Sequence, residues 1–267
     1  MNNIILISTL SMAGLGLFFA SVLALANQKL KVEEDPMIEK ILHELPGINC
    51  GACGFASCRQ YAEALAKKKA PPDKCKASGE EQKRDLAKLL GVSLKTKSKE
   101  VAVVHCGADN SVRKKKASYN GVETCLAAHN TFGGELLCDW GCLGYGDCAR
   151  ACPFGAVTMV NGLPEIDITR CTACGKCVEA CPRKIISIMK IENSKPLYVA
   201  CSSRDKGPAT RKTCQAGCIA CGICEKLTEG AFSVKNNLSR VNEEKISGIR
   251  NREEVLKKCP TKCIKEV

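Results

Sequence analysis

The sequence predicts an α+β fold in which a single N-terminal transmembrane helix precedes small domains of short helices and strands. Three observations support this prediction. The segment from Ile4 to Ala26 contains no charged residue. The chain of 267 residues carries 21 cysteines, whereas aromatic residues make up only 4%. Short β-type runs precede the cysteine motifs, and a chain with so few large apolar side chains usually folds around disulfides or metals.

The apolar N-terminal segment is long enough to cross a membrane. Its 23 residues span roughly 35 Å as a helix, and a bilayer core is about 30 Å thick. A cleaved secretory signal is the alternative, because Ala24-Leu25-Ala26 resembles a cleavage site, but no basic residue precedes the segment. Lys29 and Lys31 follow it, so the positive-inside rule predicts a single-pass protein with the bulk of the chain on the cytoplasmic side.

A cytoplasmic location argues against disulfides and leaves the cysteines free, catalytic or metal-bound. The formal net charge of +12 counts every thiol as neutral, whereas metal-bound cysteines are thiolates. Part of the basic excess therefore compensates buried negative charge, and we expect no nucleic-acid partner. Lys67-Lys68-Lys69 and Lys114-Lys115-Lys116 are interpreted as solvated charge, with a docking patch for an acidic redox partner or for anionic headgroups as the alternative.

The order of helical, polar and β-type segments divides the chain into six parts. These are an anchor at 1–27, a connector at 28–36, a small N-terminal domain at 37–92, a linker at 93–100, a central domain at 101–195 and a C-terminal domain at 196–267. In the N-terminal domain, the apolar spacing predicts helices over Ser57–Lys69 and Glu80–Leu90. Gly91 ends the second helix.

An internal repeat relates the central and C-terminal domains. Each copy opens with a β-type run that ends in cysteine, Val101–Cys106 in the first and Leu197–Cys201 in the second. A basic loop then leads to a further cysteine, Cys125 or Cys214, and to a dense cysteine motif. The repeat predicts two copies of one small cysteine-rich unit.

The most specific motif in the chain is Cys171-x2-Cys174-x2-Cys177-x3-Cys181-Pro182. This spacing is typical of 4Fe–4S ferredoxins, and in two-cluster ferredoxins the cysteine before the proline binds the other cluster. A partner motif lies upstream, Cys138-x3-Cys142-x5-Cys148-x3-Cys152-Pro153, with longer spacings. Paired zinc sites are the alternative, but zinc motifs usually combine two CxxC pairs.

The crossing rule assigns the eight cysteines of these two motifs to two clusters. The first cluster takes Cys138, Cys142, Cys148 and Cys181, and the second takes Cys152, Cys171, Cys174 and Cys177. Gly141, Gly144 and Gly146 give the upstream loop the backbone freedom that its longer spacings require. The central domain is therefore predicted to be a two-cluster, ferredoxin-like domain.

The N-terminal domain carries a different motif, Cys50-x2-Cys53-x4-Cys58-x16-Cys75. Gly51 and Gly54 lie beside the first ligands and let backbone amides approach cluster sulfurs, which tunes the reduction potential. The spacing alone also fits zinc. Beside a ferredoxin-like domain, it predicts a third 4Fe–4S cluster.

The C-terminal domain has lost half of its ligands in an orderly way. Thr228 stands where the fourth cysteine of its first motif is expected, and counting back from Cys259-Pro260 gives Ile249, Arg252 and Val255 at the ligand positions of its second. Under the crossing rule these four positions belong to a single cluster. The remaining cysteines form the complete set of the other cluster, Cys218, Cys221, Cys224 and Cys259. We expect a degenerate, one-cluster domain.

Five cysteines remain outside these four sets. Cys106, Cys125, Cys201 and Cys214 are either buried apolar side chains or one extra metal site built from the two repeats. Cys263 is either a packing residue or a substitute for Cys259. Four clusters are therefore expected, with the extra site as a possible fifth.

Several further segments resemble one family over essentially the whole chain. They are Leu45-Pro46-Gly47, Cys50-Gly51-Ala52-Cys53-Gly54, Tyr119, Gly121, Gly133-Gly134, Gly141-Cys142-Leu143-Gly144-Tyr145-Gly146-Asp147-Cys148, Cys152-Pro153-Phe154, Cys201-Ser202-Ser203 and Asp205-Lys206-Gly207. The combination resembles the B subunit of the Rnf complex, an ion-translocating ferredoxin:NAD+ oxidoreductase of bacterial membranes. The eroded C-terminal domain departs from relatives that carry more ligands.

The resemblance implies an electron-relay subunit at the bacterial cytoplasmic (inner) membrane. Its donor would be soluble ferredoxin, its partners the other membrane and peripheral subunits, and the whole complex would move Na+ or H+. No catalytic residue is expected, because the cofactors carry the chemistry and no phosphate-binding glycine loop follows a strand. The alternatives are a membrane-tethered polyferredoxin serving a hydrogenase or reductase, and a zinc-stapled interaction protein.

Overall fold

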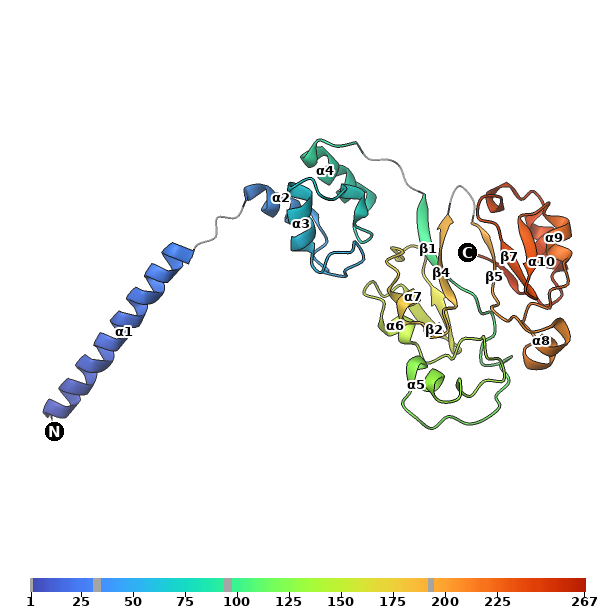
Figure 1. The fold of residues 1–267 in the computed structure, drawn as a ribbon, viewed down its shortest axis with the longest axis horizontal. Helices are drawn as coiled ribbons and strands as arrows, with labels where there is room; N and C mark the ends of the chain where they lie inside the picture. The colour runs from blue at the N-terminus through green and yellow to red at the C-terminus, as the bar shows by residue number, and fades with distance from the viewer. Residues whose placement is uncertain (1, 31–34, 94–97, 192–194) are drawn as a thin grey trace.

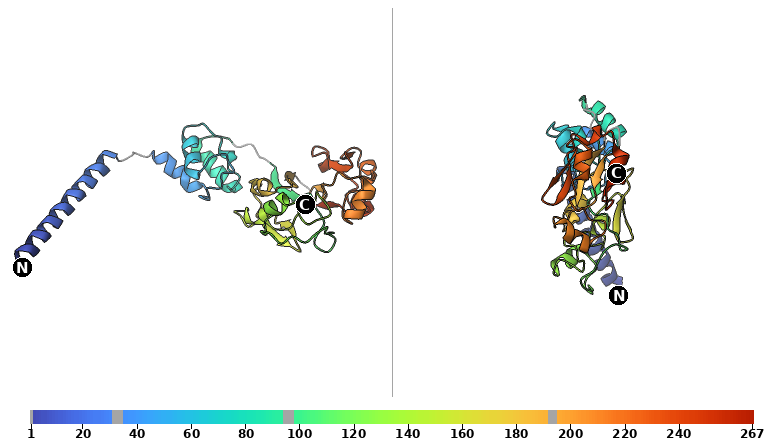
Figure 2. Two further views of the ribbon diagram at one scale, coloured as in Figure 1. Left: turned by 60° about the horizontal axis from the view of Figure 1, so that its bottom comes forward. Right: turned by 90° about the vertical axis from the view of Figure 1, so that its right-hand side faces the viewer.

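The computed structural model describes residues 2–30, 35–93, 98–191 and 195–267. Within these residues it contains one long helix, one small helical group and two units that combine short helices with two-stranded antiparallel sheets. Figures 1 and 2 show the long helix standing apart from the rest of the chain, whereas the two mixed units lie side by side.

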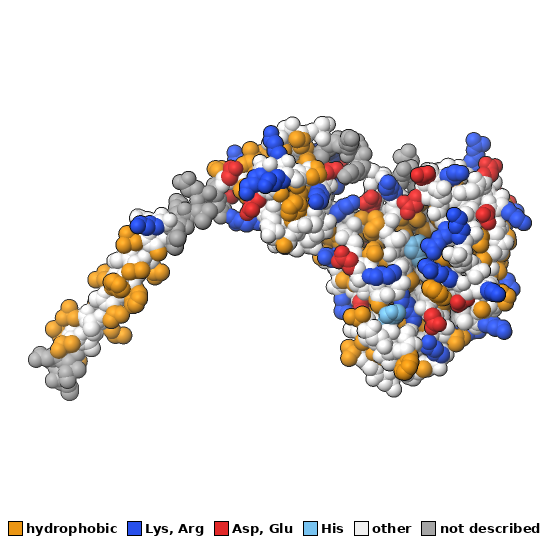
Figure 3. Space-filling view, in the orientation of Figure 1, with side chains coloured by type: hydrophobic (Ala, Val, Ile, Leu, Met, Phe, Trp, Pro, Cys, Tyr) orange, Lys and Arg blue, Asp and Glu red, His pale blue; other side chains and the backbone are white. Residues whose placement is uncertain are grey.

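The long helix is α1 (Asn2–Leu30), and it contains the apolar segment predicted from the sequence. Its stretch Ile5–Lys29 has a mean hydropathy of 2.0 and is long and apolar enough to cross a membrane. Hydrophobic side chains cover its surface (Figure 3). The hydroxyls of Ser8, Thr9 and Ser21 donate to backbone carbonyls one turn earlier, which satisfies these polar groups within the helix.

The helical group comprises α2 (Pro36–Glu44), α3 (Cys58–Ala66), the 3-10 turn η1 (Pro72–Lys74) and α4 (Glu80–Leu90). Helix α4 confirms the predicted bounds and ends at Gly91, whose φ of 65° is a left-handed cap. Helix α3 ends three residues earlier than predicted. Ile41, Tyr61 and Leu86 form the buried core of this group.

The first mixed unit has an outer strand pair and an inner hairpin. Strand β1 (Lys99–Val104) pairs with β4 (Ile186–Ile191), and β2 (Val157–Val160) pairs with β3 (Leu163–Ile166). Three short helices complete it, α5 (Cys125–Asn130), α6 (Asp147–Arg150) and α7 (Lys176–Ala180). Strand β1 begins inside the predicted linker, because Lys99 and Glu100 already pair with the end of β4.

The second mixed unit repeats this order of elements. Strand β5 (Leu197–Val199) pairs with β8 (Ile264–Glu266), and β6 (Phe232–Lys235) pairs with β7 (Leu238–Val241). Its helices are α8 (Gly207–Thr213), α9 (Ile223–Leu227), the 3-10 turn η2 (Ile246–Gly248) and α10 (Arg252–Lys258). The shared order of outer strand, two helices, hairpin, helix and closing strand confirms the internal repeat.

Polar contacts join the two mixed units. The ring of His105, just after β1, donates from Nδ1 to the Val199 carbonyl at 2.8 Å. Lys114 Nζ donates to the Lys212 carbonyl at 2.8 Å. Trp140 Nε1 donates to Asp205 Oδ1 at 3.2 Å. These bonds join three loops of the first unit to β5 and the region around α8 in the second.

Candidate metal centres

Three cysteine loops in the mixed units share one backbone conformation. Each loop has a residue with positive φ directly before a short helix and a second one two positions earlier. The pairs are Gly144 and Gly146 (φ 89° and 76°), Ala173 and Gly175 (53° and 83°), and Ala220 and Gly222 (55° and 74°). This shared conformation aligns the loops residue by residue, so that Cys142, Cys171 and Cys218 are equivalent.

Tyr145 stands at the middle ligand position of the first loop. The alignment places it level with Cys174 and Cys221, and it restores the standard spacing as Cys142-x2-Tyr145-x2-Cys148. The prediction from the sequence instead started this motif at Cys138 and required a bulged loop. The x2, x2 spacing around Tyr145 was the signal that could have identified a substituted ligand.

Cys125 lies beside this loop. It lines one cavity together with Cys142, Cys148 and Cys181. Burial raises the pKa of Cys148 to about 11, and the neighbouring Cys125 and Cys181 add to the shift. The backbone N–H of Leu126 donates to Asp147 Oδ2 at 3.0 Å, which fixes the start of α5 beside the start of α6.

Cys138 lies in a different cavity, between the two mixed units. There it meets Cys106, Cys201 and Cys214. The structure thus exchanges two cysteines relative to the prediction from the sequence: Cys125 joins the first loop, and Cys138 joins the cysteines considered as an extra site. Spacing along the chain could not show this exchange, because each cavity is closed by a residue from a separate loop.

The thiols of the other central set lie near one another. Burial raises the pKa of Cys177 to about 12, and Cys171, Cys174 and Cys152 are among the neighbours that raise it further. Backbone N–H groups point at two of these sulfurs: Ala102 donates to Cys171 Sγ at 3.4 Å and Ala156 donates to Cys152 Sγ at 3.3 Å.

In the helical group, three cysteines share the core that contains the buried Tyr61. These are Cys75, Cys53 and Cys58. Burial raises the pKa of Tyr61, and Cys75 and Cys53 raise it further. This group also contacts the first mixed unit, because Lys76 forms an ion pair with Glu100 at the start of β1.

The C-terminal cavity is lined by five cysteines, Cys218, Cys221, Cys224, Cys259 and Cys263. Cys263 is buried, with its Sγ 3.6 Å from the Sγ of Cys259. The neighbouring Cys263 thiol lowers the pKa of both Cys259 and Cys218. Cys263 therefore contacts both ends of the predicted ligand set.

Ordinary packing occupies the four lost ligand positions. The Thr228 hydroxyl donates to the Cys224 carbonyl at 2.7 Å and accepts from the Phe232 N–H at 3.1 Å. Val255 is 1% exposed in the core that contains Phe232, and Ile249 packs against it. Arg252 forms an ion pair with Glu266.

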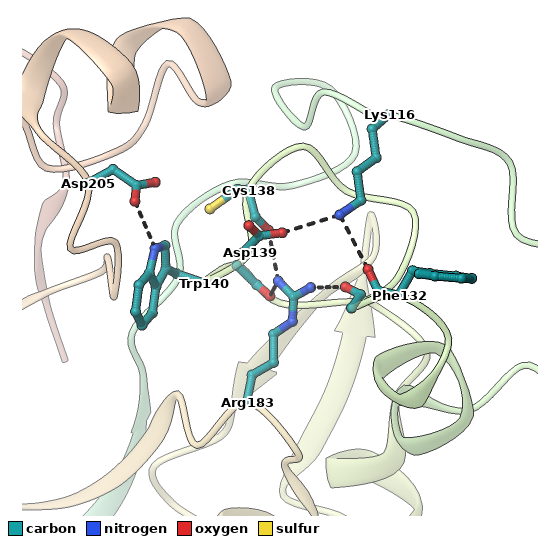
Figure 4. A network of polar contacts seen from close by, with 9 residues as sticks. Lys116, Phe132, Cys138, Asp139, Trp140, Arg183 and Asp205 are labelled. Carbon is teal, nitrogen blue, oxygen red and sulfur yellow. Dashed lines mark hydrogen bonds and ion pairs between the residues drawn. The ribbon is translucent and has the colours of Figure 1, made fainter.

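Arg183 binds the loop that carries Cys138 (Figure 4). It follows Pro182, and its guanidinium donates to the carbonyls of Cys138 and Gly141, both at 2.8 Å, and to that of Gly133. Its buried Nε has no partner among the described residues, although Arg183 lines the Cys125 cavity. A buried N–H donor without a partner, beside four thiols, is consistent with a bound group that is negatively charged and accepts hydrogen bonds.

The donor sets consist of sulfur. Within the described residues, no three His, Cys, Asp or Glu side chains lie close enough together to hold a single metal ion. The thiols line cavities instead, and all-thiolate sets of four with backbone N–H donors to sulfur suit iron–sulfur clusters.

Two family models match the chain. One, described as an Fe-S cluster family, matches residues 45–77. The other, described as a 4Fe-4S dicluster domain, matches residues 137–186. Together they cover the N-terminal cysteine motif and the two central loops.

Three curated proteins are similar over most of this chain, and each is named as the B subunit of its complex. That of the proton-translocating ferredoxin:NAD(+) oxidoreductase of Clostridium ljungdahlii is 39% identical and covers 100% of this chain and 94% of its own length. The Na(+)-translocating counterpart from Acetobacterium woodii is 36% identical, covering 99% and 78%. The protein of the ion-translocating oxidoreductase complex of Methanosarcina acetivorans is 34% identical, covering 92% and 93%.

Proposed function

The chain belongs to the family of B subunits of ion-translocating ferredoxin:NAD+ oxidoreductase (Rnf) complexes, and on this premise we propose the ligand sets through which it relays electrons. It is an electron-relay subunit of a redox enzyme complex, with a 4Fe–4S dicluster domain and one helix long and apolar enough to cross a membrane. The single observation that supports these ligand sets most directly is the cavity lined by Cys125, Cys142, Cys148 and Cys181.

The proposed ligands define four 4Fe–4S clusters. Cys50, Cys53, Cys58 and Cys75 hold the N-terminal one. Cys152, Cys171, Cys174 and Cys177 hold the second, and Cys125, Cys142, Cys148 and Cys181 hold the third, since Cys125 lies in that cavity and Cys138 does not. Cys218, Cys221, Cys224 and Cys259 hold the fourth, with Cys263 as a hydrogen-bond donor. The division at 37–92, 101–195 and 196–267 assigns one, two and one cluster.

When bound, such clusters accept and release one electron at a time, and the protein sets their potential and position. The residues of this chain provide the thiolates, backbone N–H groups aimed at sulfur and buried arginine charge. Ala102 and Ala156 donate to ligand sulfurs. Arg183 places positive charge between two thiol-lined cavities, which favours the more negative, reduced state of a cluster nearby.

The names of the relatives suggest the electron donor and the partner subunits. We propose that reduced ferredoxin delivers electrons, and that the other subunits couple their flow to NAD+ to the movement of Na+ or H+. Lys29 in the last turn of α1 supports placement of the remaining chain at the cytoplasmic side of the membrane.

One experiment tests this function. Membrane vesicles from cells lacking the gene are complemented with the wild-type chain, with Cys174→Ala, or with Thr169→Ser as a control on the same loop. Ferredoxin-dependent NAD+ reduction should return with the wild type and the control and stay absent with Cys174→Ala, and membrane subunits should copurify with the tagged chain. Unchanged NAD+ reduction without the chain would refute the proposal.

A further inference from the structure

A fifth group of four thiols occupies the junction of the two mixed units. Cys106 and Cys201 stand at equivalent places, each two residues beyond the first strand of its unit. Cys138 precedes the first loop, and Cys214 follows α8. All four line one cavity, so that each unit contributes two cysteines.

The four cysteines line one cavity, and two of them are buried. Cys106 and Cys214 are 8% exposed. Burial raises the pKa of Cys214, and Cys106 and Cys138 are the thiols that raise it further. Burial also raises the pKa of Cys201 to about 12, with Cys106 again among the contributing neighbours. Cys106 is thus the common neighbour of the other three.

Each sulfur at the junction faces a backbone N–H. Cys142 donates to Cys106 Sγ and Ser203 donates to Cys201 Sγ, both at 3.4 Å. N–H groups of Trp140 and Gly141 favour the thiolate of Cys138. The N–H of Ala216 does the same for Cys214. Hydrogen bonds of this kind stabilise cluster-bound thiolates and tune their potential.

Positive charge is also present at this cavity. Arg113 lines it, and its guanidinium is held by the carbonyls of Ala108 and Gly162, both at 2.7 Å. Its charge favours the thiolates of Cys214 and Cys142. Buried apolar packing of four cysteines would not require a fixed cation or amide donors.

The junction lies between two proposed clusters. On one side, Cys142 belongs to the Cys125 set and also lines this cavity. On the other side, the backbone N–H of Cys218, a ligand of the C-terminal set, points at the thiol of Cys201.

We propose that Cys106, Cys138, Cys201 and Cys214 bind a fifth 4Fe–4S cluster, which bridges the two mixed units. The proposal rests on the electron-relay function stated above. Its role is a one-electron relay, in which no bond forms or breaks and no proton moves. This cluster would exchange single electrons with the cluster of the Cys125 set on one side and with the C-terminal cluster on the other.

The test is an iron, sulfide and zinc count on the full chain purified anaerobically in detergent. Four clusters give about 16 irons per chain and five give about 20. The wild type should contain about 20 irons, equal sulfide and no zinc. The double variant Cys106→Ala/Cys214→Ala, which removes one ligand from each unit, should contain about 16. A Val122→Ala control, at an exposed position of the first mixed unit, should retain the wild-type count.

The outcomes separate this proposal from the broader one. A wild type with about 16 irons overturns the fifth cluster alone, whether or not the double variant folds. A wild type with about 16 irons and one zinc would show that the junction cysteines bind zinc and not an iron–sulfur cluster. A wild type without iron or sulfide overturns the relay function as well. In the folded double variant, electron paramagnetic resonance should still show the four remaining clusters, and a loss of more than one cluster's signals would contradict the assignment.

Discussion

The backbone N–H of Cys142 donates to the Sγ of Cys106 at 3.4 Å, so a ligand of one proposed cluster touches a ligand of the next. Cys142 and Cys106 belong to cavities that share a wall. Hydrogen bonds to sulfur alter the reduction potential of a cluster. A substitution at either cysteine should therefore shift the reduction potentials of both proposed clusters.

If Cys125 replaces a ligand at the position of Tyr145, a cysteine at position 145 should restore a cluster lost with Cys125. Cys125→Ala should lose one cluster, about four irons per chain, because its cavity keeps only three thiols. Adding Tyr145→Cys should restore the iron, since this position is equivalent to Cys174 and Cys221. Iron content and visible absorbance measure both steps. Tyr145→Phe serves as the control, and a Cys125→Ala variant with full iron content would rule out this ligand.

Gly175 has a left-handed backbone conformation, so replacing it with alanine should lower stability. Its φ is 83°, and an added Cβ would meet nothing within 4 Å. Gly175→Ala should therefore cost about 1–2 kcal/mol through backbone strain alone. The melting temperature of the holoprotein, followed by loss of cluster absorbance, should fall by a few degrees. Gly248→Ala, also in open space but without a positive φ, should leave it unchanged.

Removing the Arg183 guanidinium should loosen the loop that carries Cys138. Arg183→Met leaves three backbone carbonyls without their donor, at about 1–3 kcal/mol for each that stays buried. We expect faster loss of iron at elevated temperature than in the wild type. Arg211→Met, at an exposed position on α8, is the matched control. Equal rates for both variants would show that the contacts of Arg183 contribute nothing.

Cys263 should replace Cys259 when that ligand is removed. Its sulfur lies 3.6 Å from that of Cys259 in the same cavity. Cys259→Ala should therefore retain the C-terminal cluster with altered resonance, whereas Cys259→Ala/Cys263→Ala should lose about four irons. Iron loss in the single variant would restrict Cys263 to hydrogen bonding.

Helix α1 should act as an anchor and nothing more. Deleting residues 1–30 should give a coloured protein that stays in solution after ultracentrifugation, because no described residue of the later elements packs against the span Ile5–Lys29. Full-length chain should sediment with membranes. A truncated protein that is colourless, or that still sediments, would contradict this expectation.

Local patterns predicted much of this architecture. The uncharged segment within α1, the helix Glu80–Leu90 and the repeated units could be derived from composition, spacing and stop signals. The grouping of Cys152 with Cys171, Cys174 and Cys177 followed from the ferredoxin spacing.

The exchange of Cys125 and Cys138 could not be derived in this way. Cys125 reaches its cavity because α5 is tied to Asp147, and Cys138 is turned toward the junction by a loop bound to Arg183. Both contacts join residues far apart in sequence. Spacing rules describe a single loop, whereas these sites are completed by tertiary contacts.

Apolar side chains fill the place where a two-cluster C-terminal unit would bind its second cluster. Val255 and Ile249 stand at two of the expected ligand positions and pack beside Phe232. In the proposed arrangement the C-terminal unit therefore holds one cluster and has no room for a second. Of the 21 cysteines, Cys221 alone is exposed. The proposed C-terminal cluster therefore comes nearest to solvent at that ligand.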